Sequence, residues 1–319
     1  MLNSSKIASV IAVYNDEDRI GRAIGSAARS AVADGMRHEV IVVDDHSTDD
    51  TFRRAEIAAS EYSNVRVFRM PQNGGPADAR NYGLTKTDAA WFTPIDSDDV
   101  VEPQRLAVLS RTALETGSRF VADNLYLTDE EYPTRVTRLL WPSKPSGPIP
   151  LMADMFIRRC YNTEIERSEL GFLKPLIDRR GLESEDAPYR KGIRFGEDYE
   201  LYSRLLLDEV PALLVDPLGY YLVQRPHSAS RSQGAEDHKK MAEINQHLLR
   251  RPRLSGSQRK AIEGFLAFSR REWAMWQMID GINSRNPLQA ISAFSISVDA
   301  SLFVIRRLAV SRFRKETAA

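Results

Sequence analysis

The sequence contains a single cysteine, Cys160, among its 319 residues, so no disulfide bond can form within the chain. This fits a reducing compartment, where thiols stay reduced. The chain also carries no excess of either charge, because 44 lysines and arginines balance 44 aspartates and glutamates. A protein that binds nucleic acid is usually basic, so this balance argues against a nucleic-acid partner.

A long hydrophobic run is also missing. Residues 1–6 are largely polar, and the apolar run Ile7–Val13 is short and ends in a polar cluster, which is typical of a β-strand rather than of a secretory signal. No stretch approaches the roughly 18 uninterrupted apolar residues of a membrane-spanning helix. We therefore expect a cytoplasmic protein that is soluble or is bound peripherally at the inner face of the cell membrane.

The first 125 residues alternate between apolar runs and segments in which apolar residues recur every three or four positions. Strands are expected at 7–13, 40–43, 65–68, 90–95 and 120–122, and helices at 20–31, 52–59, 76–84 and 102–114. This alternation predicts an α/β fold with a parallel sheet, right-handed crossovers and helices on both faces.

The second half of the chain has a different pattern. Residues 132–150 contain five prolines and read as a loop. Helices are expected at 152–165 and 201–207. From Asp237 onward the pattern is helical, with breaks at Pro252 and near 281–287. We divide the chain into an α/β domain at 1–235 and a helical C-terminal extension at 236–319.

The last predicted helix is basic and amphipathic. Its apolar residues alternate with arginine and lysine across 299–319. Such a helix can lie on an anionic membrane surface. It could equally dock on the rest of the protein and leave its basic face in water, and the sequence leaves both interpretations open.

Polar clusters follow three of the predicted strands, at 14–17, 44–49 and 96–99. Each cluster alone could cap a helix. Ligands of open parallel sheets bind beyond the carboxyl ends of the strands, however, and three such clusters favour a binding site there. The cluster at 96–99 holds three aspartates, which repel each other without a cation. Because Mg²⁺ and Mn²⁺ bind carboxylate and phosphate oxygens, we prefer a metal site to an exposed acidic turn.

A glycine turn at 73–75 runs into the helix predicted from Pro76. Glycine permits a close approach of the backbone to a ligand. Arg80 lies about one turn inside this helix, from where its guanidinium could reach a phosphate. By itself, the motif is equally compatible with a loop-to-helix junction that carries a surface arginine.

Five segments, in this order, resemble the family 2 glycosyltransferases of the GT-A fold. They are residues 9–15, 43–49, 73–83, 96–99 and 196–198. The resemblance covers about residues 7 to 230 and extends to transferases of bacterial exopolysaccharide and succinoglycan synthesis. It implies a Rossmann-like mixed sheet, a nucleotide-sugar half at 1–125 and an acceptor half at 126–235.

The resemblance also implies roles for residues on the donor side. The backbone at Ala12 and the ring of Tyr14 would pack the nucleobase, Asp45 would bond to it, and Glu17 would contact the nucleoside. Ala12 stands where the family commonly has proline, so we expect a looser first turn.

Four further residues take implied roles at the reacting groups. Arg80 would lie near the donor phosphates, and Asp96 would contact the ribose or the metal. Asp98 would bind Mg²⁺ or Mn²⁺ directly. Asp198 would be the base that accepts the acceptor proton, although without the resemblance it would read as a carboxylate at a helix N-terminus.

Other polar residues are weaker candidates for contacts with the diphosphate or the acceptor. Residues 221–232 resemble the family's late basic loop, in which Arg225 or His227 could face the diphosphate. Glu197 lies beside the expected base, and Asp123 and Asn124 follow the fifth predicted strand.

These observations lead us to expect an inverting transfer of a hexose from a nucleotide-sugar, with UDP as the expected carrier. The acceptor would be a saccharide, and we expect a lipid-linked oligosaccharide of bacterial surface polysaccharide synthesis. A nucleotidyltransferase is an alternative, although residues 14–17 lack the glycines and basic residues of its phosphate loop. A catalytically inactive sugar-binding GT-A protein is another, against which the intact Asp45, Asp98 and Asp198 argue.

Overall fold

The computed structural model describes residues 6–161, 168–180, 182–225 and 234–316, with side chains up to Arg307 in the last segment. Its contacts divide the chain into two compact units. The first comprises residues 1–156 and 166–225, and the second residues 157–165 and 226–319. From the sequence we had expected the boundary between the two domains at 235/236. We had also placed the whole of the helix predicted at 152–165 in the first domain.

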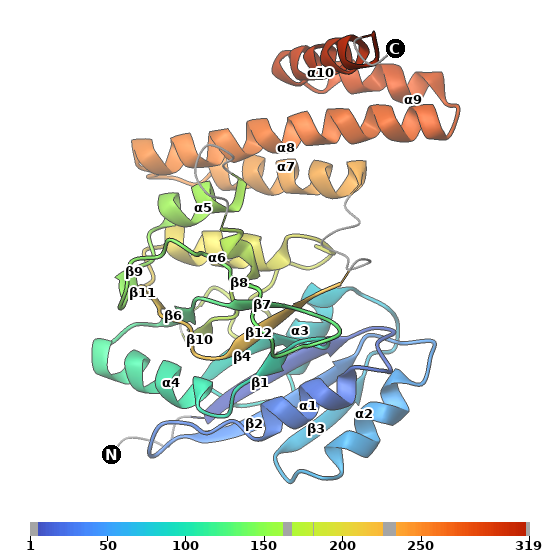
Figure 1. The fold of residues 1–319 in the computed structure, drawn as a ribbon. Coiled ribbons are helices and arrows are strands. Elements are labelled where there is room, and N and C mark those ends of the chain that lie inside the picture. The colour runs from blue at the N-terminus through green and yellow to red at the C-terminus, as the bar shows by residue number, and fades with distance from the viewer. Residues whose placement is uncertain (1–5, 162–167, 181, 226–233, 317–319) are drawn as a thin grey trace. The chain divides into compact units, whose positions relative to one another are not determined.

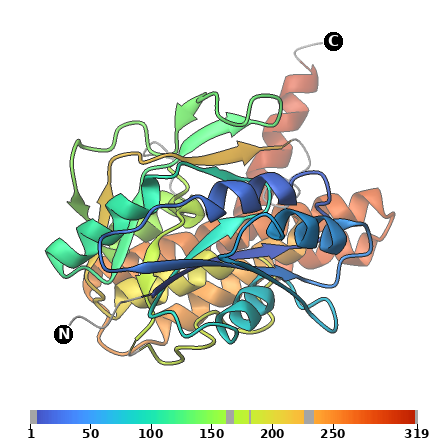
Figure 2. The same cartoon turned by 90° about the horizontal axis from the view of Figure 1, so that it is seen from below.

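The first four strands form a parallel array, as expected. β1 (Lys6–Val13) lies between β2 (Arg37–Asp44) and β4 (Trp91–Asp96), and β3 (Val65–Arg69) extends the sheet beyond β2. The crossover helices are α1 (Ile20–Ala28), α2 (Thr51–Ala59) and α3 (Pro76–Leu84). Figures 1 and 2 show α1 and α2 on one face of the sheet and α3 on the other.

The sheet is mixed rather than parallel beyond β4, which corrects the expectation drawn from the alternation and agrees with a GT-A fold. β10 (Leu176–Asp178) pairs antiparallel with both β4 and β6 (Phe120–Asp123). β11 (Ala212–Val215) and β9 (Ile149–Pro150) complete an eight-stranded sheet. A strand of three residues, such as β10, is too short for its period to be seen in the sequence.

A second, smaller sheet had no sequence signal. It contains β5 (Val100–Val101), β12 (Tyr220–Gln224), β7 (Tyr126–Asp129) and β8 (Arg138–Leu139), in that order. Residues 221–224, which we had assigned to a late loop, are therefore part of a strand. The proline-rich 132–150 segment is irregular except for β8 and β9.

Three more helices follow β4 along the chain, α4 (Arg105–Thr116), α5 (Ala153–Tyr161) and α6 (Glu197–Leu207), with a short 3₁₀ turn at Leu170–Phe172. α6 begins four residues before the predicted start at 201. Its first turn therefore contains Glu197 and Asp198.

Close packing against the sheet fixes the position of α3. A Cβ atom at Gly83 would lie 3.0 Å from Val10 Cγ1 and 3.0 Å from Val43 Cγ2. Because β1 and β2 are almost entirely buried, only glycine allows the helix to lie this close to them. The position of α3 in turn places Arg80 at the sheet edge.

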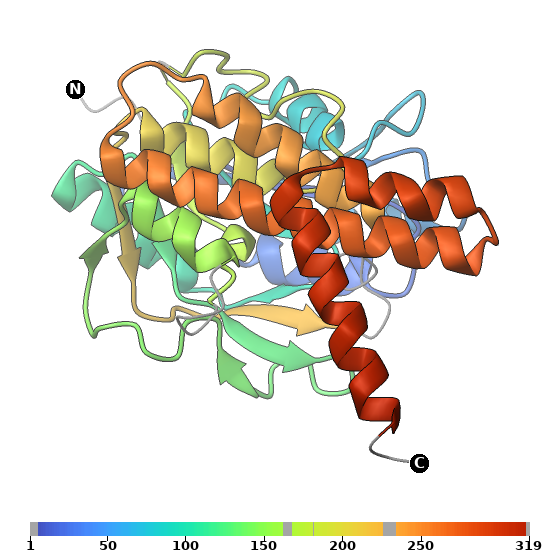
Figure 3. The same ribbon diagram turned by 90° about the horizontal axis from the view of Figure 1, so that it is seen from above.

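The second unit is helical, with the predicted breaks (Figure 3). α7 (Ala235–Leu249) packs along α8 (Gly256–Asn283), and α9 (Pro287–Ser292), the 3₁₀ turn η2 (Ala293–Ser295) and α10 (Val298–Glu316) follow. Ser255 caps α8 by accepting the Gln258 N–H, and Asn286 caps α9 in the same way. No helix among the described residues combines the length and the hydropathy needed to cross a membrane.

Candidate active site

The three predicted loops meet at one edge of the sheet. In the register of the strands, Ala12 is paired with Val43 on one side and with Asp96 on the other. The Asp45 N–H continues this pattern by donating to the Val13 carbonyl at 2.8 Å. The carboxyl ends of β1, β2 and β4 therefore deliver their polar residues to the same place, as a ligand site of this fold requires.

Asp45 organises the glycine turn. Its carboxylate accepts the N–H groups of Gly74 and Gly75, each at 2.7 Å, and the side-chain amide of Asn73 at 3.0 Å. Gly75 has φ of 91°, a conformation that favours glycine. Burial raises the pKa of Asp45, although the two backbone N–H groups oppose this shift. The turn thus occupies the carboxylate that was expected to bond to the nucleobase, and that role stays a prediction.

Tyr14 and Glu17, the other side chains expected to contact the nucleoside, differ in how accessible they are to a ligand. The side chain of Tyr14 is 48% exposed, so its ring face is open to a base. Glu17 accepts the Asp50 N–H at 2.9 Å, at the start of α2, and so already has a structural partner. The structure thus leaves Tyr14 better placed than Glu17 for contact with a nucleoside.

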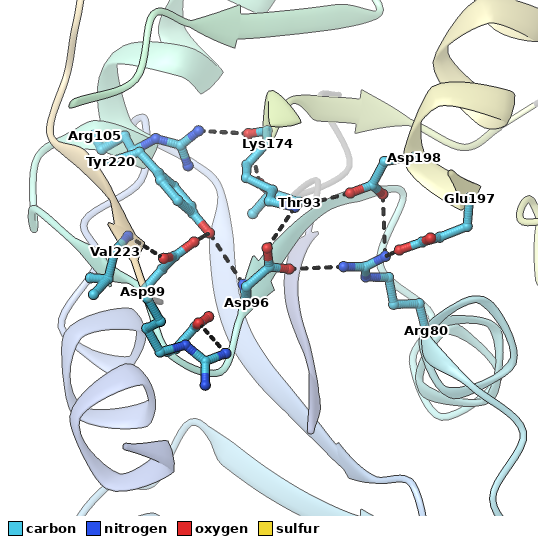
Figure 4. A network of polar contacts seen from close by, with 12 residues as sticks. Arg80, Thr93, Asp96, Asp99, Arg105, Lys174, Glu197, Asp198, Tyr220 and Val223 are labelled. Atoms are coloured by element: carbon cyan, nitrogen blue, oxygen red, sulfur yellow. Dashed lines mark hydrogen bonds and ion pairs between the residues drawn. The ribbon is translucent and has the colours of Figure 1, made fainter. Parts of the chain in front are cut away.

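Two cations and two carboxylates form a closed ring at the centre of the site (Figure 4). Arg80 bridges Asp96 at 2.8 Å and Asp198 at 3.3 Å. Lys174 bridges the same two carboxylates, each at 2.9 Å. The ring therefore joins a carboxylate at the end of β4 to one in the first turn of α6, and we call these four residues the ion-pair ring.

The ring is electrostatically strong because it is largely buried. The side chain of Lys174 is 2% exposed and that of Arg80 is 6% exposed. Burial alone would raise the pKa of Asp96, but Lys174 and Arg80 outweigh it and hold that pKa below its ordinary value. Burial would likewise lower the pKa of Lys174, but Asp198 and Asp96 hold it above its ordinary value.

Glu197 makes the centre of the site negative overall. It bonds to Arg80 at 2.7 Å, so that guanidinium serves three carboxylates. Burial raises the pKa of Glu197, with Arg80 opposing the shift and Asp198 adding to it. An incoming phosphate would have to compete with these carboxylates for Arg80, so the predicted phosphate contact requires a rearrangement.

The acidic turn after β4 is tied to the second sheet. Asp98 pairs with Arg225 at the end of β12, with 2.6 Å between Oδ2 and Nη2. Asp99 accepts the Tyr220 hydroxyl at 2.7 Å and the Val223 N–H at 2.8 Å (Figure 4). Burial raises the pKa of Asp99 well above its ordinary value, and the charges of Asp98 and Asp96 add to this shift.

Comparison with known proteins assigns the family. Residues 9–170 match the family model described as glycosyl transferase family 2. The chain belongs to this family. It is therefore a glycosyltransferase, and its membership removes the nucleotidyltransferase alternative.

Two relatives from Rhizobium meliloti (strain 1021) extend the match. The succinoglycan biosynthesis protein ExoU is 32% identical over 260 residues, which is 79% of this chain and 72% of the relative. The succinoglycan biosynthesis protein ExoO is 32% identical over 253 residues, which is 79% of this chain and 70% of the relative.

Two solved structures share the fold. S. aureus TarS 1-349 in complex with UDP-GlcNAc has a TM-score of 0.64 at 17% identity, covering 94% of this chain and 84% of the other. The mannosyltransferase PcManGT from Pyrobaculum calidifontis, in complex with GDP-Man and Mn²⁺, has a TM-score of 0.56 at 14% identity, covering 98% and 83%. These likenesses support the GT-A architecture of the glycosyltransferase.

The residues around Asp98 fit a divalent cation. Burial raises the pKa of Asp98, and the nearby charges of Asp96 and Asp16 add to this shift while Arg225 opposes it. A metal ion would relieve this crowding of negative charge. In the part of the chain that the structure describes, no three or more His, Cys, Asp or Glu side chains converge as a metal cage. One or two aspartates with phosphate oxygens and water are, however, a usual set of ligands for Mg²⁺.

Asp123 and Asn124, which were expected to contact the diphosphate or the acceptor, already have partners within the protein. Asp123 is fully buried and forms an ion pair with Arg105 at 2.7 Å. Asn124 bonds to the backbone of Trp141 in both directions, at 2.9 and 3.0 Å. Their side chains hold the fold together at the end of β6. His227 lies outside the described residues.

Lys174 is the site residue that the sequence reasoning missed. It comes from the segment before β10, and its backbone carbonyl accepts a bond from Arg105. The available signal was that it is the only charged residue between 170 and 177. A lone charge in an apolar run is rarely buried without a partner of opposite charge.

Proposed function

We propose that this glycosyltransferase moves a hexose, with inversion, from a UDP-sugar to a hydroxyl of a saccharide acceptor. The observation that carries the proposal is the ion-pair ring, which holds Asp198 beside Asp96. The same two cations hold together the carboxylate that we propose as the base and the carboxylate that we propose for the donor side.

Inversion needs a single in-line displacement. The acceptor oxygen forms a bond to the anomeric carbon as the bond from that carbon to the diphosphate breaks. The acceptor proton passes to a carboxylate oxygen of Asp198, and the electron pair of the broken bond leaves with the diphosphate. One base is sufficient, so no second nucleophilic carboxylate is required.

The leaving diphosphate needs positive charge. Mg²⁺ or Mn²⁺ held at Asp98 would supply it when bound. Arg80 and Arg225 both reach into the site, and both are now paired with its aspartates. We propose that the diphosphate takes over part of these contacts, because a phosphate is a strong partner for a guanidinium. His227 remains a candidate for the same contact.

The donor and the acceptor are proposed from different observations. Structures of the same fold that contain UDP-GlcNAc or GDP-Man support a nucleotide-sugar donor. Relatives named for succinoglycan biosynthesis support a role in polysaccharide synthesis. We further propose that the acceptor is a lipid-linked oligosaccharide, and that the enzyme works peripherally at the inner face of the cell membrane through its C-terminal helix.

The test is release of nucleotide from a panel of UDP- and GDP-sugars with Mn²⁺ or Mg²⁺. We expect one donor to be consumed, and Asp198→Asn and Asp98→Asn each to lower the rate by about 10²-fold or more. Asp216→Asn is the matched control, because that carboxylate is 53% exposed and pairs with Lys144 away from the ring. Full activity of Asp198→Asn would refute the assignment of the base.

A further inference from the structure

Exposed apolar side chains gather in one short part of the helical unit. Among the described residues, seven of the thirteen large apolar side chains that are exposed lie between residues 282 and 305. They are Ile282, Leu288, Ile291, Phe294, Val298, Leu302 and Ile305. A concentration of this kind on a soluble protein usually marks a surface that binds something.

The side of α10 that packs on α8 is a different one. Ala300 and Val304 are fully buried and form a cluster with Ala274 and Met278 of α8. Val298, Leu302 and Ile305 follow helical spacing on the opposite side and are 80%, 49% and 52% exposed. Ala300, Val304 and the partly buried Phe303 therefore dock the helix, while Val298, Leu302 and Ile305 remain exposed.

α9 and η2 carry further exposed apolar side chains. Leu288 and Ile291, one helical turn apart on α9, are 79% and 64% exposed, and Phe294 follows in η2. The Ser301 hydroxyl donates to the Phe294 carbonyl at 2.8 Å, which ties η2 to the start of α10. Figure 3 shows α9 beside the end of α8, with α10 leading away from it. We call the six side chains from Leu288 to Ile305 the α9–α10 surface.

The charge of this region identifies the partner. Residues 282–316 contain six arginines and lysines and two acidic residues, a net charge of +4 (6 − 2), whereas the whole chain has a net charge of zero. The exposed Arg285 and Arg306 belong to this excess. Asp299, one of the two acids, is neutralised by Arg271 at 2.6 and 2.9 Å.

We propose that the α9–α10 surface inserts its apolar side chains into an anionic lipid bilayer while the surrounding arginines bind the headgroups. Apolar side chains bordered by basic residues are the pattern of an interfacial membrane-binding element. A second copy of the chain is a poorer occupant, because a two-fold interface would bring the excess positive charges of both copies together. This inference rests on the proposed peripheral position at the membrane. It names the surface that would bind the membrane, which includes α9 and η2 as well as the basic helix α10.

The experiment measures binding of the full-length protein to vesicles of phosphatidylcholine, alone or mixed with phosphatidylglycerol. One variant carries Leu288→Gln and Ile291→Gln, and a second carries Val298→Gln and Leu302→Gln. We expect each pair to weaken binding to the mixed vesicles by about tenfold or more, because binding scales with the apolar area inserted. Ile57→Gln on α2, at a position 55% exposed, is the matched control and should bind like wild type.

Salt distinguishes the contribution of the arginines to vesicle binding from that of the apolar side chains. Raising the ionic strength should weaken the binding of the wild type without abolishing it, because salt screens the arginines but not the apolar contact. The proposal would be overturned if both paired variants bound the mixed vesicles like wild type, or if the wild type did not bind them at all. It would also be overturned if the wild type were a dimer in solution and both paired variants were monomers. Vesicle binding needs no donor, so failure of the proposed transferase chemistry would appear separately, in the nucleotide-release assay.

Discussion

Lys174→Met tests whether the ion-pair ring holds the two halves of the site together. Methionine keeps the apolar stem and most of the volume but removes the ammonium that contacts Asp96 and Asp198, each at 2.9 Å. Arg80 would then face Asp96, Asp198 and Glu197 alone. Removing one partner of a buried ion pair costs about 3–5 kcal/mol, and because Arg80 remains we expect a value near the lower limit.

The assay is equilibrium unfolding in urea at neutral pH. Lys144→Met is the matched control, because its side chain is also 2% exposed but its partner Asp216 is 53% exposed. Water can solvate Asp216 after the substitution, so the control should lose only about 1 kcal/mol. A loss from Lys174→Met no larger than that of the control would refute the reasoning.

A second substitution shows where the loss comes from. If unpaired buried charge is the cause, Asp198→Asn should be less destabilising in the Lys174→Met protein than in the wild type, with a coupling of about 1 kcal/mol or more. Effects that simply add, within about 0.5 kcal/mol, would mean that Lys174 and Asp198 do not act as a pair.

The difference in stability between wild type and Lys174→Met should also depend on pH. The lowered pKa of Asp96 gives stability that is present above the ordinary aspartate pKa and is lost as the pH falls through the folded value. The raised pKa of Lys174 gives stability that is present below the ordinary lysine pKa and is lost as the pH rises through the folded value. The difference in unfolding free energy between wild type and Lys174→Met should therefore be largest between about pH 5 and 10, and should become smaller at lower and at higher pH.

Two further predictions concern the sheet. Burial lowers the pKa of His38 to about 4, so its contribution is present above its ordinary pKa and is lost as the pH falls through the folded value. Relative to His38→Gln, the wild type should lose about 3 kcal/mol of unfolding free energy between roughly pH 6.5 and 4. Plots of unfolding free energy against pH that run parallel for the two proteins would contradict this. Gly83→Ala should cost about 1–3 kcal/mol in urea unfolding, because its Cβ would lie 3.0 Å from Val10 and Val43. Gly256→Ala at the start of α8, where no atom lies within 4 Å of the added Cβ, should cost nothing.

The sequence predicted the parts of the fold that are set by local patterns. β1, β2 and β4 are largely apolar and buried because helices cover both faces of the sheet. The residues just beyond them converge because parallel strands end at one edge. The helical breaks near Pro252 and Pro287 follow from local backbone chemistry in the same way.

What the sequence could not predict depends on contacts between distant segments. β10 has three residues and lies between β4 and β6 only because of pairing on both sides. The ion-pair ring joins residues 80, 96, 174 and 198, and no spacing rule connects them. The surroundings of Asp123 were equally hidden, because its partner Arg105 lies on a helix whose orientation the pattern does not give.

The ring also makes the two implied roles of Arg80 and Asp198 dependent on each other. Arg80 contacts Asp198, Glu197 and Asp96, so any phosphate that recruits its guanidinium withdraws positive charge from the proposed base. A carboxylate that loses a cationic neighbour becomes a better proton acceptor. Lys174, buried between Asp96 and Asp198, would still hold the two carboxylates together. Arrival of the donor would thus draw a cation away from the proposed base, which links the surroundings of Asp198 to the presence of the sugar to be transferred.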